Sequence, residues 1–162
     1  MKIRDIAAAI EEFAPLALQD DYDNSGLVVG RLDDEVHKAL LAVDVTEEVL
    51  DEAEREGCDI IITHHPIIFS PIKRLNSQTY VERCVERAIR KNIALYACHT
   101  NLDSTINGMS WQVGSMIGLD AMKVLEPRRD NPSGGYGVVG VLSRPENALA
   151  LLNRIKSIFD VG

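Results

Sequence analysis

The chain has 162 residues and a formal net charge of −8, and 46% of its residues are hydrophobic and 26% charged. These shares are typical of a soluble globular domain and exclude collagen-like, mucin-like and disordered chains. No run approaches the roughly 18 to 20 apolar residues of a bilayer span, and the first residues lack the apolar core of a secretory signal. We therefore expect a cytoplasmic protein without a membrane partner.

Acidic residues are concentrated in the first third of the chain. Residues 1–60 hold 17 Asp and Glu against 5 Lys and Arg. Nucleic-acid binding requires clustered basic residues, so this balance argues against a nucleic-acid partner. The three cysteines have no CxxC spacing, which predicts buried thiols rather than a disulfide framework or a structural zinc site.

The first elements are one helix and two short strands. Apolar residues at helical spacing predict a helix over residues 2–13, which ends before Pro15. A loop rich in Asp and Asn follows, and residues 27–30 form an apolar run that suits a strand. Residues 39–43 are almost unbroken in their apolar character, which predicts a strand covered on both faces and ending at Asp44.

A regular alternation of helices and strands then predicts the fold class. Thr46 and Gly57 are placed to cap the two ends of a helix, and β-branched residues 59–63 predict the next strand. A helix over about 79–92 begins with Thr79 and Glu82 at capping-box spacing, residues 93–98 predict a third strand, and a helix carrying Trp111 follows. This order predicts an α/β fold with a mainly parallel sheet and flanking helices.

The last part of the chain is expected to begin a second half. After Pro127, residues 128–135 are rich in turn-forming residues and predict a linker. Residues 136–142 predict a strand, and Pro145 is placed to start a final helix through Phe159. We therefore predict an α/β metal-site domain over residues 1–126. Residues 127–162 would form a linker with the first strand and helix of an incomplete second half.

Histidines and carboxylates follow the predicted parallel strands at their carboxyl ends, where open α/β sheets bind ligands. Asp44 follows the first of these strands, and the other candidates are His64, His65, His99 and Asp103. Imidazoles and carboxylates suit a first-row metal ion such as Zn, Fe, Mn, Co or Ni. The alternative is that these histidines are surface groups or hydrogen-bond partners without a metal.

The adjacent histidines indicate a centre with two ions. Neighbouring side chains in an extended chain point to opposite sides, and Pro66 keeps His65 extended, so each imidazole is suited to a different ion. With Asp103 as an oxygen ligand, His64 and His65 predict part of a two-metal centre that can activate water for hydrolysis.

The remaining candidates have simpler interpretations. His37 lies in a charged stretch and is expected to be a solvated surface residue, and Cys98 is expected to be a buried thiol rather than a nucleophile. His99 is interpreted as a hydrogen-bond partner of the ligands or an acid/base group, and Asp44 has a similar place or is only a turn carboxylate.

Three stretches of the chain resemble the NIF-three-like family (NGG-one-interacting factor three), whose members are also called GTP cyclohydrolase I type II homologues. They are Tyr22 to Leu27 with Gly30, Ile61 to Phe69 around the His-His-Pro sequence, and His99 to Asp103. The resemblance implies an α/β fold, a hexamer, and a dinuclear metal centre with ligands at positions that match His64, His65 and Asp103.

The resemblance also implies ligands that this sequence lacks. Family members complete the centre with a His and a Glu from a C-terminal half, whereas no histidine follows His99 here and Glu146 lies in no matching motif. We therefore expect a chain truncated before that half. The implied function is a metal-dependent hydrolase of a nucleotide-like or cyclic amide small molecule, with catalytic residues not identified. The alternative is a non-catalytic metal-binding regulatory or protein-interaction module.

Overall fold

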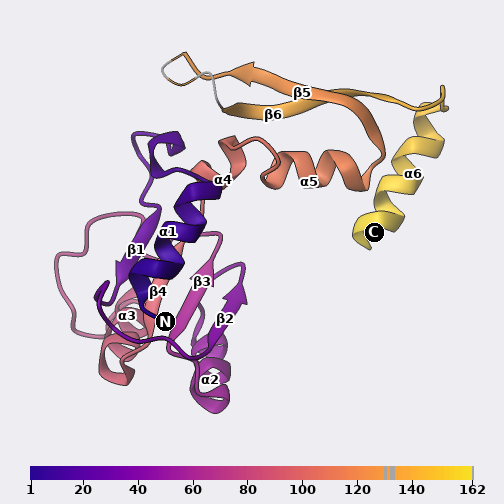
Figure 1. Cartoon of the computed structure of the whole chain (residues 1–162). Helices are drawn as coiled ribbons and strands as arrows, with labels where there is room; N and C mark the ends of the chain where they lie inside the picture. Colours follow the sequence, from indigo (N-terminus) through magenta and orange to yellow (C-terminus); the bar gives the residue numbers. More distant parts are fainter. Residues whose placement is uncertain (130, 132–133, 162) are drawn as a thin grey trace. The chain divides into compact units, whose positions relative to one another are not determined.

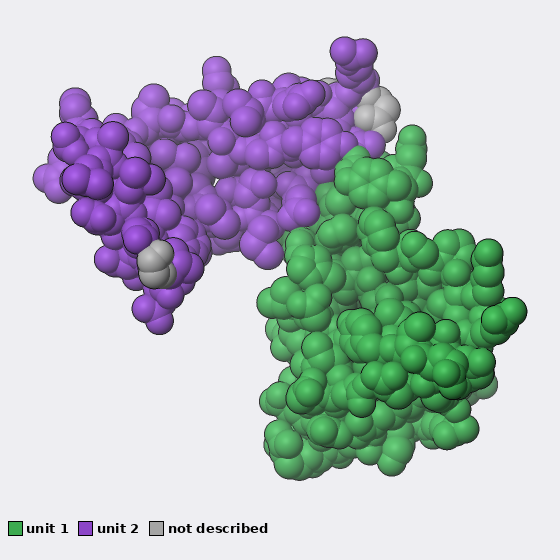
Figure 2. Space-filling view, turned by 180° about the vertical axis from the view of Figure 1, so that it is seen from behind, with its two compact units in different colours: residues 1–102 green, residues 103–162 purple. Residues whose placement is uncertain are grey.

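A computed structural model describes residues 1–129, 131 and 134–161. The chain divides into two compact units, Met1–Leu102 and Asp103–Gly162 (Figures 1 and 2). The first unit holds the sheet and the histidines. None of the described helices is long and apolar enough to cross a membrane.

The first unit is built on a four-stranded, mostly parallel sheet, as the alternation of elements predicts. Its strands are β1 (Gly26–Val29), β2 (Ala39–Ala42), β3 (Ile60–Thr63) and β4 (Ala94–Ala97), in the order β1-β4-β3-β2. β2, β3 and β4 are parallel, and β1 is antiparallel to β4. The carboxyl ends of β3 and β4 therefore lie side by side, which brings the residues after them together.

Helices cover both faces of this sheet, and residues on successive strand positions alternate between two cores. On one face, α1 (Ile3–Phe13) packs Ile3 and Ala7 against Ala94 and Tyr96 of β4. On the other face, α2 (Glu47–Glu56) and α3 (Tyr80–Lys91) pack against a core that includes Leu95. This two-sided burial fixes the register of the central strands, because a slip of one residue would exchange the two faces.

The predicted caps at both ends of α2 and at the start of α3 are confirmed. The Thr46 hydroxyl accepts a hydrogen bond from the Val49 N–H at 3.2 Å, and Gly57 ends α2 in the left-handed region at φ 66°. The Thr79 hydroxyl accepts one from the Glu82 N–H at 3.2 Å. The two threonine hydroxyls accept hydrogen bonds from backbone N–H groups that have no partner within the helix, and Gly57 adopts the left-handed conformation that ends α2. The caps therefore define where these short helices begin and end.

The strand predicted over residues 39–43 is present but is not covered on both faces. β2 lies at the edge of the sheet, with β3 as its neighbour. Leu41 is 74% exposed and Val43 61% exposed. A continuous apolar run is typical of a central strand, but composition alone does not distinguish a central strand from an apolar edge strand.

The second unit contains a strand that the sequence did not indicate. The elements of this unit are α5 (Met109–Met116), β5 (Leu119–Pro127), β6 (Gly135–Leu142) and α6 (Ala148–Phe159). The short α4 (Thr100–Ser104) begins in the first unit and ends in the second. β5 pairs with β6 in an antiparallel hairpin. Polar and apolar residues do not alternate regularly in β5, whose register with β6 shifts between Asp120 and Lys123, so the sequence lacks the two-residue period that marks a half-exposed strand.

The hairpin changes the interpretation of the segment expected to be a linker. Pro127 pairs with Gly135, and the Arg128 N–H donates to the Gly134 carbonyl at 3.1 Å, so the described part of this segment closes the hairpin. Residues 130, 132 and 133 of that segment lie outside the described residues. The final helix begins at Ala148 with Asn147 as its cap, rather than at Pro145.

Candidate metal site

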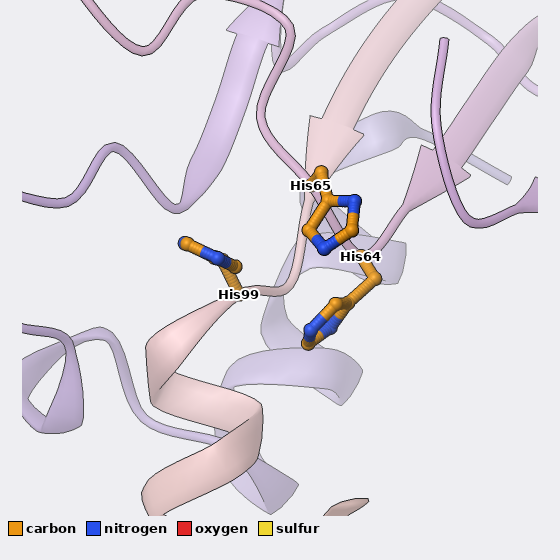
Figure 3. A group of neighbouring side chains, drawn as sticks. All are labelled: His64, His65 and His99. Carbon is orange, nitrogen blue, oxygen red and sulfur yellow. The ribbon is translucent and has the colours of Figure 1, made fainter.

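Three histidines from two parallel strand ends meet at the carboxyl edge of the sheet. His64 and His65 directly follow β3, and His99 lies between β4 and α4. Each offers a ligand atom, and these atoms lie within 4.8 Å of one another. Figure 3 shows the three rings facing a common space. The pairwise distances between ring centroids are 4.9, 5.3 and 5.6 Å.

Each of these rings makes a hydrogen bond to a protein oxygen through the same nitrogen, Nδ1. His64 Nδ1 lies 2.9 Å from the Cys98 carbonyl oxygen, and His65 Nδ1 lies 2.8 Å from Asp44 Oδ1. His99 Nδ1 lies 2.8 Å from Asp23 Oδ1. A carbonyl oxygen and an ionised carboxylate can only accept, so Nδ1 carries the proton in all three rings. In the neutral rings Nε2 is then the nitrogen with a lone pair.

Asp23 is the most strongly engaged of these supporting groups. Its side chain is fully buried, and it accepts from the Thr100 hydroxyl, His99 Nδ1, the Asn24 N–H at 2.7 Å and the Thr100 N–H at 3.0 Å. Burial alone would raise the pKa of Asp23, but these hydrogen bonds outweigh it and lower the pKa to about 2. Asp23 is therefore an anion at neutral pH and keeps His99 in one orientation.

This donor set fits a first-row transition metal ion. Imidazole nitrogen is a preferred ligand of Zn, Fe, Co and Ni, and ligating histidines usually donate their other N–H to a carboxylate or carbonyl oxygen. Here two carboxylates and one carbonyl hold three imidazoles in the tautomer that leaves the Nε2 lone pair for ligation. The arrangement is a histidine cluster that could hold a metal ion.

The structure places the other three candidate residues, Asp44, His99 and Asp103, near the carboxyl ends of the parallel strands. Asp44 does contact a predicted ligand, because it accepts from His65 Nδ1. His99 offers a ligand atom within the same group as His64 and His65, and its role as a hydrogen-bond partner or acid/base group stays a prediction. Asp103 lies in α4, four residues after His99, and its role as a ligand stays a prediction.

His37 is solvent-exposed and Cys98 is buried, as the sequence predicts. The side chain of His37 is 77% exposed, as expected of a solvated residue. Cys98 is buried, and burial raises the pKa of its thiol to about 11, so the thiol is protonated at neutral pH. Its contribution to the site is its carbonyl oxygen, which accepts from His64.

Sequence reasoning gave no role to Asp23, which lies within one of the quoted motifs. Asp23 and His99 are 76 residues apart, and their contact depends on the antiparallel pairing of β1 with β4. That pairing places the loop before β1 beside the residues that follow β4. Apart from that motif, the signal in the sequence is the density of Asp in residues 20–23, which is equally typical of a surface turn.

Comparison with known proteins gives consistent results along the whole chain. The family model described as Duf34/NIF3 (NGG1p interacting factor 3) matches residues 1–162. A Clostridium acetobutylicum protein named "GTP cyclohydrolase 1 type 2 homolog" is 35% identical over 99% of this chain and 60% of its own length. A Methanocaldococcus jannaschii protein of the same name is 37% identical over 87% of this chain and 55% of its own length.

Solved structures agree with the fold of the chain. The Staphylococcus aureus hypothetical protein SA1388 matches with a TM-score of 0.91 and 25% identity, over 99% of this chain and 65% of that one. Reduced HcgD from Methanocaldococcus jannaschii matches with a TM-score of 0.82 and 33% identity, over 97% and 60% of the two chains. The chain thus spans about three fifths of the length of these relatives.

Proposed function

This chain belongs to the Duf34/NIF3 family, and we propose that its three-histidine group binds divalent transition metal ions for a metal-dependent hydrolase reaction. The observation that carries the proposal is the shared geometry of His64, His65 and His99. All three direct Nδ1 to an oxygen of the protein and so present Nε2 as the ligand atom. Metal-ligating histidines usually donate the N–H of the other ring nitrogen to a carboxylate or a carbonyl oxygen, and all three rings share this arrangement.

In the proposal the centre holds two ions, with His64, His65 and Asp103 among the ligands and His99 as a third imidazole. The ligand atoms of the three histidines lie within 4.8 Å of one another, which is compatible with two ions roughly 3.5 to 4 Å apart, and Asp103 would add the oxygen ligand that such centres use. Zn, Fe, Mn, Co and Ni are all compatible with these ligands. In longer family members, the resemblance implies a further His and Glu ligand from the C-terminal half. The same resemblance supports a homo-oligomer, specifically a hexamer.

The substrate class proposed is a nucleotide-like or cyclic amide small molecule. Bound divalent ions would supply Lewis-acid polarisation of the scissile group and a nucleophilic water at neutral pH. The chain's own residues orient the ligands: Asp44 fixes the His65 ring, and Asp23 fixes the His99 ring. The names of the curated relatives, which refer to GTP cyclohydrolase, support this class.

The test is turnover of GTP and of simple cyclic amides by the metal-depleted chain after addition of Zn, Mn, Fe, Co or Ni in turn. The proposal predicts hydrolysis that requires an added ion and is lost in His65→Ala, while His37→Ala, at an exposed histidine outside the group, keeps it. Metal binding with no turnover of any substrate would refute the hydrolase and favour the non-catalytic module. Equal turnover with and without metal would refute the metal-dependent reaction.

A further inference from the structure

Lys73 and Arg74 have no ion-pair partner within the fully described residues 1–102. Every other Lys and Arg side chain in that range has one. Residues 1–102 are all described and hold 19 acidic and 11 basic residues. Nine of the basic side chains lie within 4.0 Å of a carboxylate. Lys73 and Arg74 do not. In so acidic a unit, two unpaired cations side by side are positioned for an anion from outside.

These two residues line an apolar groove. They lie on the loop between β3 and α3, which passes beside β1 at the edge of the sheet (Figure 1). The groove has a volume of about 580 Å³, and no acidic residue lines it. Its other walls come from β1, the loop and α3, and their side chains are apolar apart from one glycine: Val28, Val29, Gly30, Ile68, Ile72, Leu75, Val85 and Ile89.

The apolar part of the groove is accessible from solvent. Leu75 is 50% exposed and Ile89 51% exposed, and both Lys73 and Arg74 are exposed. An occupant can therefore place an apolar side chain between the loop and α3 while its charges remain at the rim. The loop is fastened near its start, because the Asn24 side-chain amide donates to the Ile68 carbonyl at 2.6 Å. This contact limits the cost of ordering the wall on binding.

We propose that this groove binds an acidic segment of a partner polypeptide, with an apolar side chain in the groove and carboxylates on Lys73 and Arg74. Two cations on consecutive residues match two carboxylates on one extended chain, whose alternate side chains are roughly 7 Å apart, better than a single anion. Apolar contact supplies affinity, and the two charges give selectivity for acidic over basic partners. The site is separate from the histidines and does not depend on metal.

The test measures binding of a fluorescein-labelled hexapeptide, in which aspartate alternates with leucine, to the full chain. Fluorescence anisotropy of the label reports the bound fraction. The proposal predicts that the double variant Lys73→Glu/Arg74→Glu weakens binding by about tenfold or more, and that raising NaCl from about 50 to about 300 mM weakens binding to the wild type. Ile89→Asn, at a half-exposed wall position, should also weaken it. Lys2→Glu/Arg55→Glu is the control with an equal change of net charge, because both side chains are exposed and neither lines the groove.

Several results would overturn the proposal. Equal binding by Lys73→Glu/Arg74→Glu and by the control Lys2→Glu/Arg55→Glu would remove the role of the two groove cations. A hexapeptide with lysine in place of aspartate that binds equally well would remove the selectivity for acidic partners. Displacement of the peptide by about 10 mM inorganic phosphate at constant ionic strength would indicate a site for a small anion. Self-association that the double variant abolishes, without peptide binding, would make a second copy the occupant.

Discussion

Replacement of Asp23 by asparagine tests the arrangement that holds His99. Asn24 N–H and His99 Nδ1 donate to Oδ1 of Asp23, and the Thr100 N–H, the Thr100 hydroxyl and the Ser25 hydroxyl donate to Oδ2. Asparagine keeps the shape but replaces one oxygen with NH₂. Whichever oxygen is replaced, the new donor faces a backbone N–H that cannot change its role.

The size of the effect follows from the pKa of Asp23 and from this clash. Lowering the pKa from 3.8 to about 2 corresponds to about 2 kcal/mol of folding free energy, at about 1.4 kcal/mol for each pKa unit. A buried donor left without an acceptor adds roughly 1 kcal/mol or more. We therefore expect Asp23→Asn to lower the free energy of unfolding of the first unit by about 3 kcal/mol at pH 7.

The dependence on pH has a defined sign. The folded pKa lies below the unfolded one, so the contribution of Asp23 is complete above pH 4 or so and is lost as the pH falls through about 2. The difference between wild type and variant should thus shrink by about 1 kcal/mol from pH 7 to pH 3. Urea unfolding followed by far-UV circular dichroism measures it, and fluorescence of Trp111 reports the second unit separately.

Asp21→Asn is the matched control, because Asp21 is exposed in the same loop, and it should change stability by less than about 0.5 kcal/mol. The reasoning would be refuted if Asp23→Asn changed stability no more than this control. A deficit as large at pH 3 as at pH 7 would equally refute the assignment of the effect to the charge of Asp23.

Three further predictions concern the site and the core. Asp44→Asn should weaken Zn binding about 10- to 100-fold in equilibrium dialysis, because the His65 ring loses its charged partner; unchanged affinity would contradict a supporting role. Leu50→Ala should cost about 2 to 5 kcal/mol in urea unfolding, because Leu50 is fully buried, whereas Leu41→Ala at the exposed edge strand should cost less than 1 kcal/mol or so. Thr79→Ala should cost about 1 kcal/mol by the loss of the α3 cap, and Thr79→Ser should restore most of it.

The helices and the parallel strands could be predicted because their signals are local. Thr46, Gly57 and Thr79 mark helix ends through their own side chains or backbone, and the structure confirms all three. β5 could not be predicted in this way, because its register shift interrupts the alternation of polar and apolar residues and only its pairing with β6 makes it a strand. The exposure of Leu41 had the same origin, since the place of β2 at the sheet edge depends on the order of the strands.

The candidate site divides in a similar way. His64, His65 and His99 could be placed together because each follows a predicted strand, and parallel strands end at a common edge. The partner of His99 could not be assigned, because Asp23 reaches the site through β1, the one antiparallel strand of this sheet. The carbonyl of Cys98 has no side-chain signature at all, so no sequence pattern could assign it to His64.

Metal content is the most direct test of the central claim that the three histidines form a metal site. The chain, dialysed against Zn, Mn, Fe, Co or Ni and then against buffer, would be analysed by inductively coupled plasma mass spectrometry beside His64→Ala, His65→Ala, His99→Ala and His37→Ala. We expect the wild type and His37→Ala to retain transition metal, and the other three variants to lose it with the circular dichroism spectrum unchanged. No retained metal in the wild type, or equal retention in all variants, would contradict the central claim.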